Sequence, residues 1–164
     1  MRRFPLASIQ IRPARADDYH DLCDLFDEVD ELHRAALPCI FRKPPDPVRE
    51  REYVLGLMAD PNVLLLVADL GGMLAGLAYV LVRDTPLLPV FAPRRYAIID
   101  SIIVTSSVRR QGVGQLLADE VERWARARGA ASIELNVYEF NTAALQFYET
   151  LGYSTLSRKM SKSL

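Results

Sequence analysis

The sequence has few of the residues that metal centres and disulfide scaffolds require. Among 164 residues there are two cysteines, Cys23 and Cys39, and two histidines, His20 and His33. Two cysteines cannot form a disulfide framework, and the chain has no Cys-x-x-Cys or His-x-x-x-His pair, so we expect no metal site. We expect both thiols to be reduced, as is typical of a cytoplasmic protein.

Long hydrophobic runs and an excess of one charge are also missing. The longest apolar runs, 63–68 and 77–82, are far shorter than the roughly 20 residues of a membrane-spanning helix. The first residues lack the apolar stretch of a secretory signal. Lys and Arg number 20 against 21 Asp and Glu, without the basic excess of a nucleic-acid binder. We therefore expect a cytoplasmic protein whose partners are neither nucleic acid nor membrane.

The composition is that of an ordinary globular protein. Half of the residues are hydrophobic and a quarter are charged, which is enough apolar surface for a sizeable core. A chain of this length predicts a single domain spanning residues 1–164.

Hydrophobic periodicity predicts strands alternating with helices. The expected strands are 8–13, 63–69, 73–83, 95–104, 132–137 and 153–160. The expected helices run from an N-cap at Asp17 to His33, from near Pro47 to Met58, over 112–128 and over 141–151. Hairpin-connected strands together with one strand–helix–strand unit favour a mixed sheet with helices packed on its faces.

One stretch carries a pattern typical of phosphate binding. The apolar strand 95–104 leads into a short loop, and Gly112 and Gly114 then open a long amphipathic helix. Helix N-termini offer unpaired N–H groups and a positive dipole end, and glycines let a phosphate approach the backbone. Arg109 and Arg110 add positive charge, although solvated surface arginines are the alternative interpretation. Gln115 follows the last glycine, where a Walker A loop needs lysine.

Two segments together resemble a known family. Arg109-Arg110-Gln111-Gly112-Val113-Gly114 resembles the R/Q-x-x-G-x-G/A motif of the GNAT superfamily of acetyl-CoA-dependent N-acetyltransferases. The segment 141–153, NTAALQFYETLGY, is similar to that family's N-x-x-A-x-x-F-Y-x-x-x-G-F/Y pattern. The resemblance implies an α/β (α+β) fold with a mixed, mostly antiparallel central sheet of about six or seven strands, flanked by about four helices.

The resemblance also implies roles for individual residues, with acetyl-CoA as co-substrate and no metal. The pyrophosphate would be held by Arg109, Arg110, Gln111, Gly112, Val113, Gly114 and Gln115, and the pantetheine arm would pair with Ile102, Ile103 and Val104. Asn141 and Ala144 would border the same arm. Tyr148 matches the family tyrosine near the thioester sulfur, and a plain core position is the alternative.

Asp100 is the residue that we predict as the catalytic base. It interrupts an apolar strand two residues before Ile102, where many family members carry an acid. An amine must lose a proton before it attacks a thioester, and a carboxylate can accept that proton. The period of two predicts that Asp100 shares a face with Ile98 and Ile102. A strand-edge residue bonded to the proline-rich loop, with a water chain as the base, is the alternative.

The acceptor would be a small-molecule or peptide amine, whose identity the sequence does not reveal. We expect His33, Phe41, Asp100 and the loop 84–95 to shape its site. A capping or packed histidine at the end of the first helix is the alternative interpretation of His33. The acidic first helix either attracts a cationic amine or is a solvated face. The apolar loop 87–91 favours a pocket wall or a homodimer contact.

Two other functions fit the same residues. A GNAT-like module that binds acyl-CoA without turnover would show coenzyme affinity and no transfer. A nucleotide-binding oxidoreductase fragment would need a third glycine where Leu117 stands.

Overall fold

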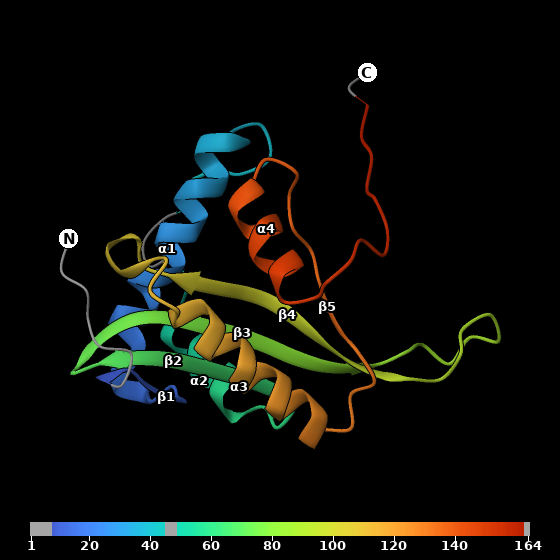
Figure 1. The fold of residues 1–164 in the computed structure, drawn as a ribbon, viewed down its shortest axis with the longest axis horizontal. Helices are drawn as coiled ribbons and strands as arrows, with labels where there is room; N and C mark the ends of the chain where they lie inside the picture. Colours follow the sequence, from blue (N-terminus) through green and yellow to red (C-terminus); the bar gives the residue numbers. More distant parts are fainter. Residues whose placement is uncertain (1–7, 45–48, 163–164) are drawn as a thin grey trace.

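The fold is built on one five-stranded sheet (Figure 1). The computed structural model describes residues 8–44 and 49–162. The strands, in the order β1-β2-β3-β4-β5, are β1 (Gln10–Pro13), β2 (Val63–Leu70), β3 (Met73–Asp84), β4 (Arg95–Val104) and β5 (Ile133–Leu135). Strands β1 to β4 are antiparallel and β5 is parallel to β4. The sheet is therefore mixed and mostly antiparallel, as predicted.

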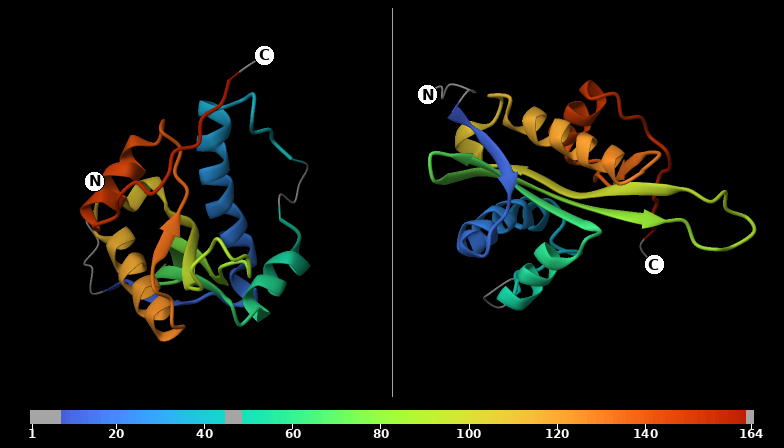
Figure 2. Two further views of the ribbon diagram at one scale, coloured as in Figure 1. Left: turned by 90° about the vertical axis from the view of Figure 1, so that its right-hand side faces the viewer. Right: turned by 90° about the horizontal axis from the view of Figure 1, so that it is seen from below.

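In the described part of the chain, four helices cover the two faces of the sheet, as predicted (Figure 2). They are α1 (Tyr19–Ala36) and α2 (Arg51–Ala59) on one face, and α3 (Val113–Ala127) and α4 (Thr142–Thr150) on the other. Short 3₁₀ turns, η2 (Ala16–Asp18) and η3 (Ser106–Val108), precede α1 and α3. The predicted start near Pro47 lies outside the described residues, and α1 has Asp18 rather than Asp17 as its N-cap.

Each face of the sheet has its own core. Beneath α3, Val113, Leu117 and Val121 are fully buried in a cluster that includes Val80 and Ile99. These helix residues are the apolar stripe of the sequence, repeating at three and four residues. The helices α1 and α2 cover a second cluster, built from Leu22, Phe26, Val54 and Leu77 among others.

A charged network fixes the first strand to the start of α1. The guanidinium of Arg12 donates to both carboxylate oxygens of Asp18, at 2.7 and 2.9 Å, and to Asp69 at 3.0 Å. The backbone N–H of Arg15 donates to Asp18 at 2.6 Å. Asp18 is buried, and these bonds keep its charge satisfied there.

The expectation of six or seven strands is wrong, because 153–160 is not a strand in the structure. This segment runs extended without pairing to β5 (Figure 1). Its apolar residues do not alternate, and Leu156 and Met160 are 79% and 85% exposed. The segment thus lacks an apolar face to bury. The strand predicted at 132–137 is shortened to β5. Within the described residues, no helix is long and apolar enough to cross a membrane.

Candidate active site

The pairing of strands β4 and β5 ends halfway along β4 (Figure 1). Their pairing covers only Ala97 with Ile133, Ile98 with Glu134 and Ile99 with Leu135. Strand β5 then ends, whereas β4 continues to Val104. From residue 100 onward, β4 therefore has one edge with no strand beside it among the described residues.

Two residues present their backbone groups at this free edge. The carbonyl of Ile103 points toward Gly76 of β3, and the N–H of Thr105 donates to Ala75 of β3 at 3.0 Å. The backbone N–H and C=O groups of successive residues point to opposite edges of a strand. The backbone groups of Ile102 and Val104 therefore point to the free edge. Of the three residues predicted to hold a pantetheine arm, Ile102 and Val104 are thus placed to pair with a ligand. Ile103 pairs within the sheet instead.

A β-bulge interrupts β4 where the free edge begins. The register pairs Tyr79 with Ser101 and Val80 with Ile99, so Asp100 is the extra residue. A bulge bends its strand and changes which face the following residues meet. The bulge therefore coincides with the divergence of β4 from β5.

The bulge overturns one prediction about Asp100. Ile99 and Ile102 both pack on the α3 side, whereas Ile103 packs on the α1 side. The alternation of side chains between the two faces of the sheet is thus shifted by one residue between positions 99 and 102. Asp100 does not share a face with Ile102, because the extra residue shifts the period of two by one.

Asp100 lies on the side of the sheet that α1 and α2 cover. It is exposed and accepts a hydrogen bond from the Ser101 hydroxyl at 3.0 Å. Burial, together with smaller contributions from the charges of Tyr53 and Asp100, raises the pKa of Tyr79 to about 12. Tyr79 packs against the core cluster under α1 and α2. The carboxylate of Asp100 is exposed and therefore accessible to a ligand.

The loop between β4 and α3 has two left-handed residues. Arg110 has φ 59° and Gly112, the N-cap of α3, has φ 85°. A non-glycine residue in this region is strained, and such strain gathers at ligand sites. Gln111 lies between them. Left-handed residues can turn successive N–H groups toward a common anion. The two positive φ angles are compatible with the predicted phosphate site, which stays a prediction.

The first turn of α3 adds further donors. Its first backbone bond runs from Leu116 to Gly112 at 3.1 Å, which leaves the N–H groups of Val113, Gly114 and Gln115 without helical partners. A Cβ on Gly114 would lie 3.2 Å from the Phe147 ring of α4. Gly114 therefore also allows α3 and α4 to pack closely, a role beyond the predicted approach of phosphate.

The side chain of Arg109 forms a hydrogen bond and an ion pair within the protein. Its Nε donates to the Val104 carbonyl at 2.8 Å, and its Nη2 forms an ion pair with Glu28 of α1 at 2.8 Å. Glu28 also accepts from the N–H of Ser106 at 3.0 Å. The sequence predicted two equivalent arginines, whereas in the structure Arg109 and Arg110 have different surroundings.

Helix α4 positions the predicted tyrosine. The Asn141 side chain caps the helix by accepting from the N–H of Ala144 at 3.1 Å, which gives both residues a structural role. Tyr148 is half-buried beside Tyr153, with ring centroids 5.5 Å apart. Burial raises the pKa of Tyr148 well above its usual value. Its hydroxyl therefore keeps its proton at neutral pH and is able to donate a hydrogen bond.

An aromatic cluster joins the end of α1 to the loop before α4. His33 lies 5.2 Å from Phe41, 5.5 Å from Tyr138 and 5.6 Å from Phe140, between ring centroids. Its Nδ1 donates to the Val29 carbonyl at 2.8 Å. The structure thus brings the predicted residues His33 and Phe41 together. Sequence reasoning missed Tyr138 and Phe140, whose signal was two aromatic residues just before the cap of α4.

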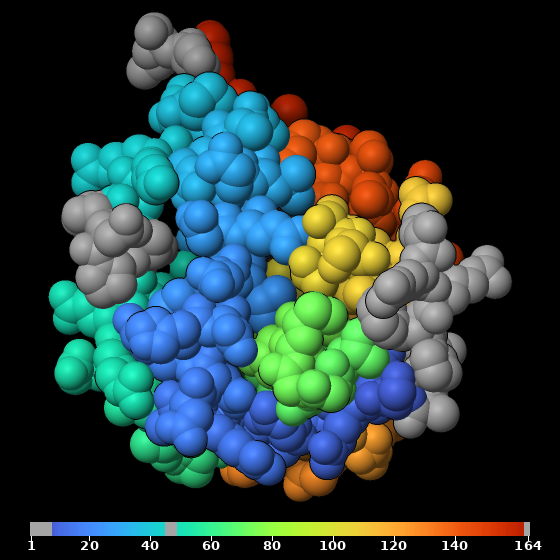
Figure 3. All heavy atoms as spheres, turned by 90° about the vertical axis from the view of Figure 1, so that its left-hand side faces the viewer, coloured from blue at the N-terminus to red at the C-terminus, as the bar shows by residue number. Residues whose placement is uncertain are grey.

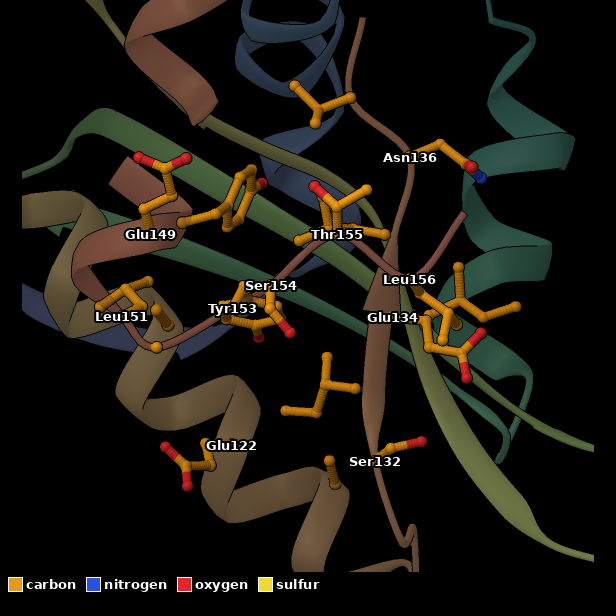
Figure 4. Close-up of a pocket in the computed structure, with 18 of the residues that line it drawn as sticks. Glu122, Ser132, Glu134, Asn136, Glu149, Leu151, Tyr153, Ser154, Thr155 and Leu156 are labelled. Atoms are coloured by element: carbon orange, nitrogen blue, oxygen red, sulfur yellow. The ribbon is translucent and has the colours of Figure 1, made fainter. Parts of the chain in front are cut away.

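A groove of about 1250 Å³ lies between α3, β5, α4 and the segment that follows α4 (Figure 4). Glu122, Glu134 and Glu149 lie around it. Of the predicted site residues, it reaches Gln115 and Tyr148 but not Asp100 or His33. The predicted residues therefore lie on both faces of the sheet, on either side of the free β4 edge. No cluster that could hold a metal ion is found in the described part of the chain.

The acidic residues of the first helix are largely paired. Asp27 and Glu31 bind Arg34, and Asp30 binds Arg49 at 2.8 Å. Most of these carboxylates are therefore neutralised by arginines of the same protein. This pairing favours the interpretation of a solvated face over attraction of a cationic amine.

Comparisons with known proteins point in one direction. The chain is 27% identical over 107 residues to an aminoglycoside N(6')-acetyltransferase type 1 from Klebsiella aerogenes, covering 65% of this chain and 69% of that protein. It is 28% identical to a mutant BH1408 protein from Bacillus halodurans, with a TM-score of 0.90 over 94% of this chain and 99% of that one.

An aminoglycoside N-acetyltransferase solved in complex with CoA has the same fold, with a TM-score of 0.70 and 16% identity over 94% of this chain and 98% of that one. The model of the acetyltransferase (GNAT) family matches residues 26–153, which is most of the chain and includes β4, the left-handed loop and α4. The chain therefore belongs to the GNAT acetyltransferase family.

Proposed function

We propose that this protein transfers the acetyl group of acetyl-CoA to a primary amine, by direct attack within a ternary complex. The observation that carries the proposal is the junction of two features. The unpaired edge of β4 leads directly into the left-handed loop and the open first turn of α3. A ligand with an amide-bearing arm and a pyrophosphate fits this junction, because one end needs backbone pairing and the other needs an anion site.

The proposed coenzyme site uses mainly backbone groups. Ile102 and Val104 offer the free edge to the arm. The N–H groups at the start of α3, with its positive dipole end and the exposed Arg110, hold the phosphates. Acetyl-CoA supplies the activated acetyl group. The sequence prediction of residues 109–115 as the phosphate site remains a proposal, with Arg109 in the different role described below.

Asp100 and Tyr148 are the proposed catalytic residues. Asp100 is an exposed carboxylate at the bulge, on the face of the sheet that α1 and α2 cover. It accepts the proton of the incoming ammonium, directly or through water. Tyr148 keeps its proton because burial raises its pKa. It donates a hydrogen bond to the departing thiolate and thereby stabilises the charge that develops there.

The aromatic cluster is the proposed wall of the acceptor site. His33, Phe41, Tyr138 and Phe140 give it an apolar lining. The resemblance to a named aminoglycoside acetyltransferase makes aminoglycosides the first small-molecule amines to test, ahead of peptide amines. A homodimer stays a prediction, with the exposed Leu87 and Val90 of the β3–β4 hairpin as the surface to test. Residues 1–164 as one acetyltransferase domain also remain a prediction.

The test is acetyl transfer over a panel of amine classes, read by product mass. Mass is the better readout because the exposed Cys39 would react with thiol reagents. Acetylated product beyond one equivalent per protein supports the proposal. Tight coenzyme A binding without transfer to any amine would favour the alternative, an acyl-CoA-binding module without turnover. Preference for NAD over coenzyme A would reject both.

A further inference from the structure

Glu28 of α1 ties the β4–α3 loop to the opposite layer of the protein. One carboxylate oxygen accepts from the N–H of Ser106 at 3.0 Å and from Arg109 Nη2 at 2.8 Å. Arg109 Nε donates in turn to the Val104 carbonyl at 2.8 Å. Figure 3 shows α1 and the segment after β4 side by side on this face of the molecule. One carboxylate and one guanidinium thus connect α1, the end of β4 and the start of η3.

The contact with Val104 bears on the free edge itself. The Val104 carbonyl points away from β3, toward the side where a ligand would pair. Arg109 donates a hydrogen bond to that carbonyl, so the part of the edge that is open to a ligand ends at the N–H of Val104. Arg109 therefore marks the point at which backbone pairing stops and the phosphate loop begins.

The pair also limits the conformations of a strained loop. Arg110, the next residue, has φ 59°. A non-glycine residue persists in this region only where its surroundings hold it there. Glu28 and Arg109 fix the loop at Ser106 and Arg109, on the side of Arg110 that leads back to β4. The α3 helix fixes the other side.

We infer that Glu28 is a positioning residue for the coenzyme site and that Arg109 is its brace rather than a phosphate ligand. The inference rests on the proposed function, because it assumes that coenzyme A binds the loop. The inference can be tested by the direction in which coenzyme A affinity changes when the charge of Glu28 is removed. Glu28 is an anion near a site for anions, so simple electrostatics predicts that its removal tightens coenzyme A binding. A positioning role predicts that its removal weakens binding.

The experiment compares Glu28→Gln with Glu31→Gln by calorimetric titration with coenzyme A. Glutamine keeps an oxygen for the N–H of Ser106 and loses the charge that holds Arg109. Glu31 is a matched control, because it undergoes the same change on the same helix, is 67% exposed and pairs with Arg34 instead. We expect Kd to rise about tenfold in Glu28→Gln, as for the loss of one charge-assisted bond. We expect no rise in Glu31→Gln.

A double variant tests whether Glu28 acts through Arg109. Arg109→Gln should raise Kd to a similar extent, and Glu28→Gln/Arg109→Gln should bind no more weakly than either single variant. Amide hydrogen exchange without ligand gives a second readout. Exchange over residues 105–112 should be faster in Glu28→Gln than in wild type, and unchanged in Glu31→Gln.

The outcomes separate this inference from the proposed function. Wild-type protein that does not bind coenzyme A would overturn both. Wild-type binding with an equal or lower Kd in Glu28→Gln would overturn the positioning role alone. Losses that add in the double variant would also overturn it, because Arg109 would then contact the phosphates independently of Glu28.

Discussion

Replacing Asp18 by asparagine should destabilise the protein far more than most changes of one atom. The carboxylate accepts bonds from Arg12 at 2.7 and 2.9 Å and from Arg15 at 2.6 Å, and both partners of the ion pair are only 11% exposed. Asparagine offers one oxygen and no charge, which leaves Arg12 with a single carboxylate partner, Asp69. We expect a loss of about 2–4 kcal/mol in the free energy of unfolding. For a domain of this size the melting temperature should fall by about 5–15 °C.

The pH dependence provides a second check on Asp18. The hydrogen bonds from Arg12 hold its pKa below the usual range, although burial opposes them. A lowered pKa in the folded state contributes stability that is fully present above the unfolded pKa of about 4 and is lost as pH falls through the folded pKa. Urea unfolding should therefore show a large difference between wild type and Asp18→Asn at pH 7 that shrinks progressively below pH 4.

Asp27→Asn is the control, because Asp27 is 47% exposed and its partner Arg34 also binds Glu31. It should cost less than about 0.5 kcal/mol. Equal shifts in the two variants at pH 7 would refute the argument that burial of the pair decides its contribution.

Three further predictions concern the proposed site. Gly112→Val should raise the Kd for coenzyme A at least about tenfold and cost about 1–2 kcal/mol of stability, because φ is 85° there; an unchanged Kd would place the phosphate site elsewhere. Tyr148→Phe should lower kcat by roughly 10²–10⁴-fold with little change in melting temperature; an unchanged kcat would leave Tyr148 as a packing residue. Asp100→Asn should lose most rate at neutral pH and recover partly at high pH, where more amine is deprotonated. A higher KM at every pH with kcat intact would make Asp100 a substrate anchor instead.

Local patterns predicted the parts of the fold that local interactions decide. The paired glycines Gly71 and Gly72, both with positive φ, made the β2–β3 hairpin recognisable. The apolar stripe of α3 predicted its buried face, and Gly129 ends this segment with φ 74°. The glycines and arginines of the loop before α3 are adjacent in sequence, which is why a phosphate site could be proposed there from local pattern alone.

The features missed depend on partners far along the chain. The bulge at Asp100 exists because of the register with β3, about 20 residues earlier. The contact between Arg109 and Glu28 could not be foreseen, because the two residues lie 81 positions apart in the sequence. The predicted strand 153–160 failed for a related reason, since a strand needs a neighbour and β5 ends at Leu135.

The most direct test of the proposed acetyl transfer uses isotopically labelled acetyl-CoA, followed by mass spectrometry of both amine and protein. We expect the label to appear on an amine acceptor over many turnovers, with no labelled protein intermediate, and we expect Gly112→Val and Tyr148→Phe to reduce the rate. Failure of the wild-type protein to bind coenzyme A at millimolar concentration, or label that accumulates on a cysteine before it reaches the amine, would contradict it.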